Sequence, residues 1–374
     1  MKFNVSSTDL SGHLQAISRV INAKNTLPIL DSFLFELRDG TLLITGSDGE
    51  TTMTTQVEVT EGVEDGKVAI TAKTLLDALR EGADQPLTFE VNQDSFEVTV
   101  SYLNGHYSMM GQNPEVYPLP LGLGENATHV VLKPNVLLKA ISSTLFATAD
   151  DELRPVMNGI YFDITDQDIT FVSSDGHKLV RYRTSDAQGD QQAAFILPKK
   201  PAGLLKNLLA KEESDVTVSF NDRNAVISVG DYRLTCRLIE GKYPNYNSVI
   251  PQSNPYVLTI DRQTIIGGIR RVSIFSSQAS SLIKLTLREN SLTLSAQDID
   301  FSTSAQEVVD CQYVGTDMNI GFKATFLLDI FNNISSNEVT IALADPSRAG
   351  VVEPAEQEEG ESLLMLLMPM MLND

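Results

Sequence analysis

Three stretches of this sequence carry the same pattern at nearly equal spacing, and this repetition limits the possible folds more than any other feature. An apolar, β-branched strand that enters a tight turn is predicted over 169–179, which reads ITFVSSDGHKL. The same form occurs over 42–49, and over 292–298 without the glycine. The aspartates Asp48, Asp175 and Asp298 lie 127 and then 123 residues apart. Such a period predicts three copies of one domain.

Other landmarks keep the same register. An apolar strand that ends in a lysine and is followed by leucines or similar residues at helical spacing occurs three times, and its lysines are Lys73, Lys199 and Lys323. The segment around Tyr107 and Pro118 recurs around Tyr232 and Pro244. Three domains of common size fit into 374 residues. We expect boundaries that give domains 1–125, 126–252 and 253–374.

Each copy is predicted to contain one helix, several strands, a second helix and several further strands, with the first copy opening in a strand at Met1. The apolar spacing predicts helices over 8–24, 74–80, 134–148, 201–210, 262–275 and 324–334. Alternating segments between them predict antiparallel hairpins, one of them turning at Asp39-Gly40. The expected fold class is α+β, with two helices packed on antiparallel sheets in each copy.

Bulk composition is that of a globular protein, with 42% hydrophobic and 21% charged residues. No run of 18 apolar residues is present, and the N-terminus reads as a strand rather than a signal peptide, so a cytoplasmic location is expected. Cys236 and Cys311 are isolated in the sequence, which argues against both a disulfide framework and a cysteine metal site. No metal and no cofactor is expected.

The charge distribution is uneven along the chain. The formal net charge is -21, which alone argues against a nucleic-acid partner. Six windows that cover the predicted helices and their leading residues nevertheless hold 14 Lys or Arg and 5 Asp or Glu, and the remainder holds 14 and 44. One interpretation gives this distribution no function, because solvated helices often collect lysine while acidic residues occupy loops. The stronger interpretation is a surface that meets phosphate on one side and repels it on the other.

Two other classes of protein fit parts of the sequence. Ser173 or Ser174, with Asp175 and His177, could be taken for a hydrolase triad, but neighbours on one strand point in alternating directions, whereas a triad converges from separate elements. The second alternative is a β-rich scaffold that binds proteins and no DNA. The acidic total favours a scaffold, while the acid-free windows 133–148 and 198–211 count against it.

The motif set resembles a known family over the full length of the chain. The three-fold repeat, the TLPIL segment at 26–30, the SDGHKL segment at 174–179, the YPNY segment at 243–246 and the MPM segment at 368–370 are together similar to the bacterial DNA sliding clamp, the beta subunit of DNA polymerase III. The resemblance implies three clamp domains per chain and a head-to-tail homodimer that closes a six-domain ring. It implies a processivity factor that encircles duplex DNA without catalysis.

The resemblance also implies site residues. Lys24, Lys73, Lys199 and Lys200 lie where the family contacts DNA, and long point charges of this kind suit phosphate rather than base edges. Tyr107 and Met109 on an edge strand are expected to face Ile274 and Phe275 of the partner subunit. Pairing that edge across the interface would remove an aggregation hazard.

The family binds its polymerase, its clamp loader and other replication and repair proteins through a short peptide in an apolar cleft between the second and third domains. Methionines suit a pocket that accepts several peptides. The tail departs from the frequent family ending Met-Arg-Leu, because Met371 is followed by Leu372, Asn373 and Asp374. The matching cleft residues are Met157, Ser174, Gly176, His177, Lys178, Leu179, Pro244, Val249, Leu366, Met368, Pro369, Met370 and Met371.

A glutamate-rich segment precedes this tail. Read from the sequence alone, it is a solvated acidic loop in the last hairpin of the chain. Its acidic residues are Glu353, Glu356, Glu358, Glu359 and Glu361.

Overall fold

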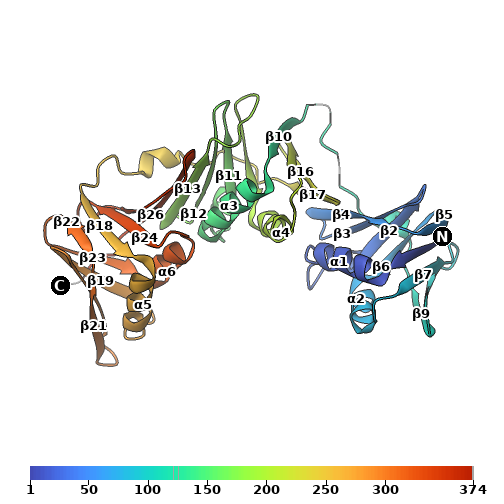
Figure 1. Cartoon of the computed structure of the whole chain (residues 1–374), viewed down its shortest axis with the longest axis horizontal. Helices are drawn as coiled ribbons and strands as arrows, with labels where there is room; N and C mark the ends of the chain where they lie inside the picture. Colours follow the sequence, from blue (N-terminus) through green and yellow to red (C-terminus); the bar gives the residue numbers. More distant parts are fainter. Residues whose placement is uncertain (121, 125, 373–374) are drawn as a thin grey trace. The chain divides into compact units, whose positions relative to one another are not determined.

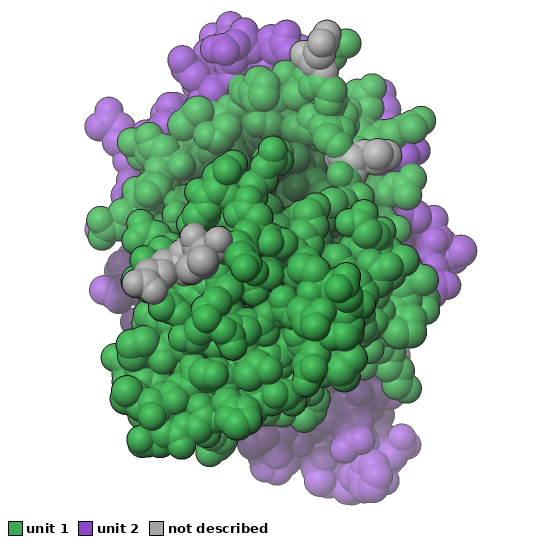
Figure 2. Space-filling model, turned by 90° about the vertical axis from the view of Figure 1, so that its right-hand side faces the viewer, with its two compact units in different colours: residues 1–138, 203–238 green, residues 139–202, 239–374 purple. Residues whose placement is uncertain are grey.

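The computed structural model describes residues 1–120, 122–124 and 126–372, and the side chains of 61–63 are outside the description (Figure 1). The chain divides into two compact units, which Figure 2 shows in different colours. The first unit contains residues 1–138 and 203–238, and the second contains 139–202 and 239–374. Each unit is described by itself below.

The first unit contains two antiparallel sheets. The five-stranded sheet has the order β5-β1-β7-β8-β9, and the eight-stranded sheet has the order β10-β15-β16-β17-β4-β3-β2-β6. Their strands are β1 (Lys2–Ser6), β2 (Ser32–Arg38), β3 (Thr41–Ser47), β4 (Thr51–Glu58), β5 (Glu61–Glu64), β6 (Gly66–Thr71), β7 (Pro86–Val91), β8 (Glu97–Tyr102), β9 (Gly105–Met110), β10 (Thr128–Leu132), β15 (Val216–Phe220), β16 (Asn224–Val229) and β17 (Tyr232–Arg237).

The second unit also contains two antiparallel sheets. The nine-stranded sheet has the order β14-β11-β12-β13-β26-β25-β24-β18-β22, and the four-stranded sheet has the order β21-β20-β19-β23. Their strands are β11 (Gly159–Ile164), β12 (Ile169–Ser174), β13 (Lys178–Thr184), β14 (Ala193–Pro198), β18 (Tyr256–Asp261), β19 (Leu282–Arg288), β20 (Ser291–Asp298), β21 (Thr303–Asp310), β22 (Gln312–Val314), β23 (Met318–Lys323), β24 (Glu338–Leu343), β25 (Gly350–Pro354) and β26 (Glu361–Leu367).

Two helices occur in each sequence repeat, as predicted. The pair α1 and α2 pack together in the first unit, and α5 packs on α6 in the second. None of the helices in the described part of the chain is long and apolar enough to cross a membrane. Their bounds are α1 (Ser7–Ser18), α2 (Ala72–Glu81), α3 (Pro134–Thr144), α4 (Lys199–Leu209), α5 (Arg262–Ser273) and α6 (Ala324–Asn332).

Local sequence explains several of these elements. The β2–β3 hairpin turns at Asp39 and Gly40, whose φ values of 48° and 77° fit a turn that matches the twist of the flanking strands. Helix α5 begins after Asp261, whose carboxylate accepts the Thr264 N–H at 2.7 Å. The apolar face predicted for the first helix consists of Leu10, Leu14, Ile17 and Ile21. The first three are fully buried in α1, while Ile21 lies beyond its end and is half-buried.

Two predicted helices end four or more residues earlier than expected. Helix α1 ends at Ser18 rather than at residue 24, and the tighter bonds Val20 N–H to Ile17 C=O and Ile21 N–H to Ser18 C=O close its last turn. Lys24 therefore lies on an exposed loop and not on a helix. Helix α3 ends at Thr144 and continues as a 3-10 turn over 145–147. The Thr144 hydroxyl donates to the Ala140 carbonyl at 2.7 Å, a back-bond that bends helices.

The expectation of a solvated acidic loop is wrong for Glu361. Its side chain is 9% exposed, and its carboxylate pairs with the Lys139 ammonium and accepts the Tyr182 hydroxyl at 2.7 Å. Glu358 reaches the same ammonium at 3.3 Å. The reason is the pairing of β26 with β13, which places Glu361 opposite Thr184 and beside α3. Glu353 is half-buried, and burial raises the pKa of its carboxyl.

Strand pairing also joins neighbouring repeats. The last strand of the second repeat, β17, pairs antiparallel with β4 of the first repeat, inside the first unit. The last strand of the third repeat, β26, pairs in the same way with β13 of the second, inside the second unit. The last strand of the first repeat, β9, is the equivalent of β17 and β26, and β21 of the third repeat is the equivalent of β4 and β13. Each of these two strands forms one edge of its own sheet (Figure 1).

Candidate nucleic-acid and partner interfaces

The turn from Ser174 to Lys178 is built by its own side chains. The Ser174 hydroxyl donates to the Lys178 carbonyl at 2.8 Å and accepts the Gly176 N–H at 3.1 Å. The Asp175 carboxylate accepts the N–H groups of His177 and Lys178 at 2.8 and 2.9 Å. Gly176 has a φ of 90°, a backbone conformation that residues with a side chain rarely adopt. The turn therefore presents Gly176 and His177 to solvent in a fixed geometry.

Lys178 connects this turn to α6 of the third repeat. Its side chain is 7% exposed, and its ammonium lies 2.7 Å from Asp175 and 3.6 Å from Asp329. The same ammonium lies over the ring of Phe326, 4.5 Å from the centroid. The His177 ring stacks against Phe326 at 5.8 Å. Lys178 is thus a buried tie between two repeats and not a free cation.

The tail after β26 continues along the same turn. The Met368 N–H donates to the His177 carbonyl at 2.9 Å, and the Met370 N–H donates to the Gly321 carbonyl at 2.7 Å. Beneath lies an apolar cluster that includes Leu179, Tyr243 and Leu366 and has Val156, Tyr246 and Ile250 packed against it. The second and third repeats therefore share one apolar region next to the turn.

The predicted cleft residues fall into two groups by exposure. One group supports the region from below: Met157, Ser174, Lys178, Leu179 and Leu366 are buried. The other group is available to a ligand. It consists of Gly176, His177, Pro244, Val249, Met368 and Met371, which are exposed, with Pro369 and Met370 half-buried.

Sequence reasoning missed three residues of this region. Arg154 is half-exposed, and its guanidinium donates to the Asp175 carbonyl at 3.3 Å and lies beside Gly176. Phe326 and Asp329 contact Lys178 from α6, as described above. No motif marks these three, because they come from other segments and meet the turn only in the folded chain. The apolar spacing of α6 groups Phe326 with Leu327 and Ile330 and does not show that Phe326 is only half-buried.

The hydrolase alternative finds no support in this geometry. The Ser173 hydroxyl is fully buried and donates to the Thr144 carbonyl at 2.5 Å. Asp175 is engaged by Lys178, and the His177 ring lies against Phe326. Among the described residues, no group of three or more His, Cys, Asp or Glu could hold a metal ion.

The predicted DNA-contacting lysines lie at or near the starts of helices, apart from Lys24. Lys73 is the second residue of α2, its side chain is 87% exposed, and it pairs with Asp77 at 2.8 Å. Lys199 and Lys200 begin α4, and Lys199 pairs with Asp150 at 2.5 Å. Exposed pairs of this kind contribute little stability and can exchange for a phosphate.

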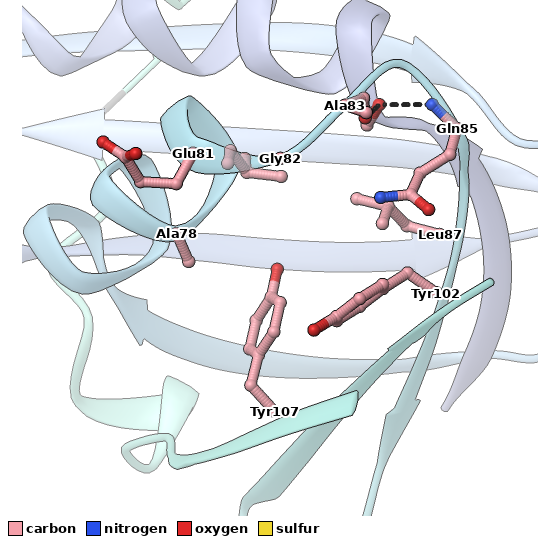
Figure 3. Close-up of a pocket in the computed structure, with 10 residues that line it drawn as sticks. Ala78, Glu81, Gly82, Ala83, Gln85, Leu87, Tyr102 and Tyr107 are labelled. Carbon is pink, nitrogen blue, oxygen red and sulfur yellow. Dashed lines mark hydrogen bonds between the residues drawn. The ribbon is translucent and has the colours of Figure 1, made fainter. Parts of the chain in front are cut away.

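The predicted dimer residues lie at exposed edges. Tyr107 and Met109 are half-buried on β9, while Ile274 and Phe275, just after α5, are 76% and 39% exposed. A pocket of about 400 Å³ adjoins β9 and is lined by Tyr102, Tyr107 and the end of α2 (Figure 3). Figure 3 shows the Tyr107 side chain directed from β9 toward Ala78 of that helix. Burial, and then the neighbouring Tyr102, raise the pKa of Tyr107.

Comparison with known proteins gives full-length matches. The chain is 28% identical to the beta sliding clamp of Haemophilus influenzae, over 98% of this chain and 99% of that protein. It is 26% identical to the beta sliding clamp of Escherichia coli over 100% of both. The crystal structure of a sliding clamp from Bartonella birtlesii bound to griselimycin matches with a TM-score of 0.91 and 26% identity, covering 100% of both chains.

A sliding clamp from Pseudomonas aeruginosa bound to griselimycin has the same fold, with a TM-score of 0.94 over 100% of both chains at 24% identity. Three family models of the DNA polymerase III beta subunit match in sequence. The N-terminal domain model covers 1–121, the central domain model 131–245 and the C-terminal domain model 247–370. The chain therefore belongs to the DNA polymerase III beta subunit family, the sliding clamps, which are non-catalytic processivity factors.

Proposed function

We propose that two copies of this chain close head to tail around duplex DNA and hold the replicative polymerase on its template. The clamp loader and other replication and repair proteins would use the same peptide site. No step of chemistry is involved, and the site of action is the cytoplasm, where bacterial DNA is replicated. The single observation that carries the dimer is the strand pairing between repeats.

Two equivalences between the repeats support that pairing. Asp48 and Asp175 begin the same turn, because their N–H groups donate to Thr51 and to Lys178 respectively, and Thr51 is therefore equivalent to Lys178. In the third repeat the corresponding hairpin pairs Asp298 with Thr303. Ala296 pairs with Ala305 there, as Gly46 pairs with Met53 and Ser173 with Val180. Thr303 is thus the third member of this set.

The last strands are matched by a second set of bonds. Gln112, Ile239 and Met370 each donate a backbone N–H to the strand that precedes the second helix of their repeat. Three residues earlier in each repeat stand Met109, Cys236 and Leu367. Cys236 pairs with Thr51, and Leu367 pairs with Lys178. By the same rule Met109 should pair with Thr303 of the partner subunit, and Ser108 with the partner's Ser304.

Burial supports the same contact. At the two junctions inside the chain, the equivalent residues are almost fully buried. Leu234 and Met365 are equivalent to Tyr107, and Cys236 and Leu367 are equivalent to Met109. On the free edge β9, Tyr107 and Met109 are only half-buried. A third junction would bury them and give the pocket beside Tyr107 an occupant, for which Ile274 and Phe275 of the partner subunit are the exposed apolar candidates. Because the contact is heterologous, it must close to avoid a filament.

Lys24, Lys73, Lys199 and Lys200 are proposed to contact phosphate without reading sequence. Each phosphate that they neutralise on duplex DNA should add about 0.9 to the salt slope of binding. Retention on DNA would instead come from encirclement. Replacing Lys199 and Lys200 by Glu should therefore reduce loading and leave retention of loaded rings unchanged.

The peptide site is proposed at the apolar region next to the turn from Ser174 to Lys178. Its exposed rim of Val249, Met368 and Met371, with His177, offers apolar contact above a buried base. Griselimycin is bound by clamps of the same fold from two organisms.

Disulfide cross-linking tests the proposal directly. With Cys311 replaced by serine, the double variant Ser108→Cys with Ser304→Cys should form an intermolecular disulfide under mild oxidation, since directly opposed strand residues have suitable Cα separations. The matched control, Ser108→Cys with Gln306→Cys, is out of register and should cross-link poorly. The ring should be loaded on nicked circular DNA first and cross-linked afterwards; it should then stay bound in high salt and be lost after the DNA is linearised.

Two results would contradict the proposal. Equal cross-linking in both cysteine pairs would reject the register. If the protein shows no association with circular DNA that depends on ionic strength, the alternative of a protein scaffold that binds no DNA is favoured.

A further inference from the structure

We infer that the thioethers of Met368 and Met371 are modification sites, and that their reversible oxidation to sulfoxides releases ligands from the proposed peptide site. This inference rests on the proposed function and concerns the regulation of the same site. The oxidant is a peroxide, and the reductant that restores the site is a thiol-dependent methionine sulfoxide reductase.

The accessible methionines of this chain are concentrated in two places. The chain has ten methionines, and five of them are buried, namely Met1, Met53, Met157, Met318 and Met365. The other five are half-buried or exposed; two lie on β9 and three in the tail after β26, and they are Met109, Met110, Met368, Met370 and Met371. Three accessible thioethers within four residues therefore stand at the rim of the proposed peptide site.

Side-chain exposure predicts which of these sulfurs react first. Met371 and Met368 are 80% and 43% exposed, whereas Met365, three residues before Met368, is fully buried. A peroxide must reach the sulfur, so the two rim residues should be oxidised while Met365 is protected. Met370 is half-buried and should react more slowly than Met371.

Oxidation converts an apolar side chain into a polar one. A lone pair of the sulfur attacks one peroxide oxygen, the O–O bond breaks and an S–O bond forms. The sulfur loses two electrons, and the second oxygen leaves as water. In the reverse reaction the sulfoxide oxygen leaves as water while two thiols of the reductase become a disulfide. The cycle changes the polarity of the side chain and leaves the polypeptide intact.

The backbone of the tail is held independently of these sulfurs. The Met368 N–H donates to the His177 carbonyl at 2.9 Å, and the Met370 N–H donates to the Gly321 carbonyl at 2.7 Å. Because the side chains of Met368 and Met371 are exposed, a sulfoxide on either residue stays hydrated in the free protein. Oxidation should therefore leave the stability of the fold unchanged and act on ligand binding.

A bound apolar ligand changes the surroundings of the sulfoxide. The ligand would remove its oxygen from water, next to an apolar cluster that includes Leu179 and Leu366. A polar group that is buried without a hydrogen-bond donor opposes binding, and one such group corresponds to about a tenfold loss of affinity. The flexible thioether that suits several ligands is thus also the group that peroxide converts.

The test uses the full-length protein with Cys311→Ser, which removes the more accessible of its two thiols. Griselimycin is the probe, because two clamps of this fold bind it. Its affinity is measured by isothermal titration calorimetry before and after mild treatment with hydrogen peroxide, and peptide mass spectrometry identifies the oxidised residues. We expect sulfoxides on Met368 and Met371 but not on Met365, and binding weakened about tenfold or more. Methionine sulfoxide reductases A and B, one for each epimer, should restore the affinity.

Two variants assign the effect to these sulfurs, and each is compared with itself before and after oxidation. The double variant Met368→Leu with Met371→Leu lacks both rim sulfurs, so oxidation should change its affinity by less than about twofold. Met110→Leu is the matched control, because it removes an exposed methionine of β9 in the first unit. This control should lose as much affinity on oxidation as the unaltered protein.

The outcomes separate the proposed site from its regulation. If the untreated protein does not bind griselimycin, or if Val249→Arg binds it unchanged, the proposed peptide site fails. If Met368 and Met371 are oxidised without loss of affinity, or if the double leucine variant loses as much as the unaltered protein, the site stands and its oxidative regulation is wrong. Urea unfolding that shows a less stable oxidised protein would mean that oxidation acts on the fold, which also contradicts the inference.

Discussion

At the scale of single residues, the turn from Ser174 to Lys178 shows how one short motif holds two repeats together. Burial alone would raise the pKa of the Asp175 carboxyl. The Lys178 ammonium and the N–H groups of Lys178 and His177 outweigh burial and hold that pKa below its usual value. The ionised form of Asp175 is therefore stabilised by the folded state.

This gives a prediction for the dependence of stability on pH. Because the folded pKa of Asp175 is lowered, its contribution is present above the unfolded pKa of about 4 and is lost as the pH falls through the folded pKa. Asp175→Asn should lower the free energy of unfolding by about 2 kcal/mol at pH 7, since it leaves a buried Lys178 with only Asp329. Urea unfolding at pH 7 and pH 3 should show the difference shrinking in acid, while Asp222→Asn, at an exposed site, should have little effect at either pH.

At the scale of elements, the hairpin from β25 to β26 is attached to α3 and to the end of β13. The Ser185 N–H donates to the Gly360 carbonyl at 2.9 Å, and Lys139 on α3 pairs with Glu358 and Glu361. Burial alone would lower the pKa of Lys139, but these two glutamates outweigh it and raise that pKa. One cation of the acid-free window 133–148 is thus used within the protein and is not free for phosphate.

Glutamate-to-glutamine changes in this hairpin should separate the buried acid from the solvated ones. Glu361→Gln should cost about 2 kcal/mol of unfolding free energy, because it leaves Lys139 with only the exposed Glu358 and weakens the bond from Tyr182. Glu359→Gln removes the same charge from an exposed position and should change stability by less than about 0.5 kcal/mol. Equal effects in chemical unfolding would mean that the Lys139 contact carries no stability.

At the scale of the whole molecule, the free edges β9 and β21 determine whether the chain can remain alone. Open edges recruit other strands, so the protein must pair or protect them. Glu307 on β21 is half-buried and is bonded to Arg271 of α5, an inward-pointing charge of the kind that discourages wrong pairing.

Light scattering at micromolar concentration should give a mass near twice the 40.9 kDa of one chain. Ile274→Arg places a charge in the proposed contact and should shift the mass toward one chain. Val314→Arg alters an equally exposed apolar residue on β22, in another sheet, and should leave the mass of the dimer unchanged. A monomer that persists at high concentration in the unaltered protein would leave the scaffold alternative ahead.

The fold class and the three repeats could be predicted because their signals are local or periodic. The hairpin at Asp39-Gly40 and the buried Leu10 and Leu14 of α1 were correctly predicted from turn chemistry and helical spacing. The strands β5, β21 and β22 were not predicted: β5 and β22 are too short to carry a pattern, and polar and acidic residues interrupt the alternation in β21. The boundaries at 125 and 252 remain predictions.

The site was only partly accessible from sequence. The residues of the SDGHKL motif could be named, but burial divides them into supporting and exposed groups in a way that no spacing shows. Arg154, Phe326 and Asp329 were missed because their contacts with the turn depend on packing between repeats. The same cause made the solvated interpretation of Glu361 wrong.

The pairing of β17 with β4 and of β26 with β13 has a consequence for how such an assembly can fail. Each junction contributes its own twist, and in a closed dimer the errors of six junctions must cancel. Met53 and Leu234 are buried where β17 pairs with β4, and a substitution at either residue would change the angle between these two strands. Closure of the ring therefore depends on the strand pairings inside each chain as much as on the contacts between subunits.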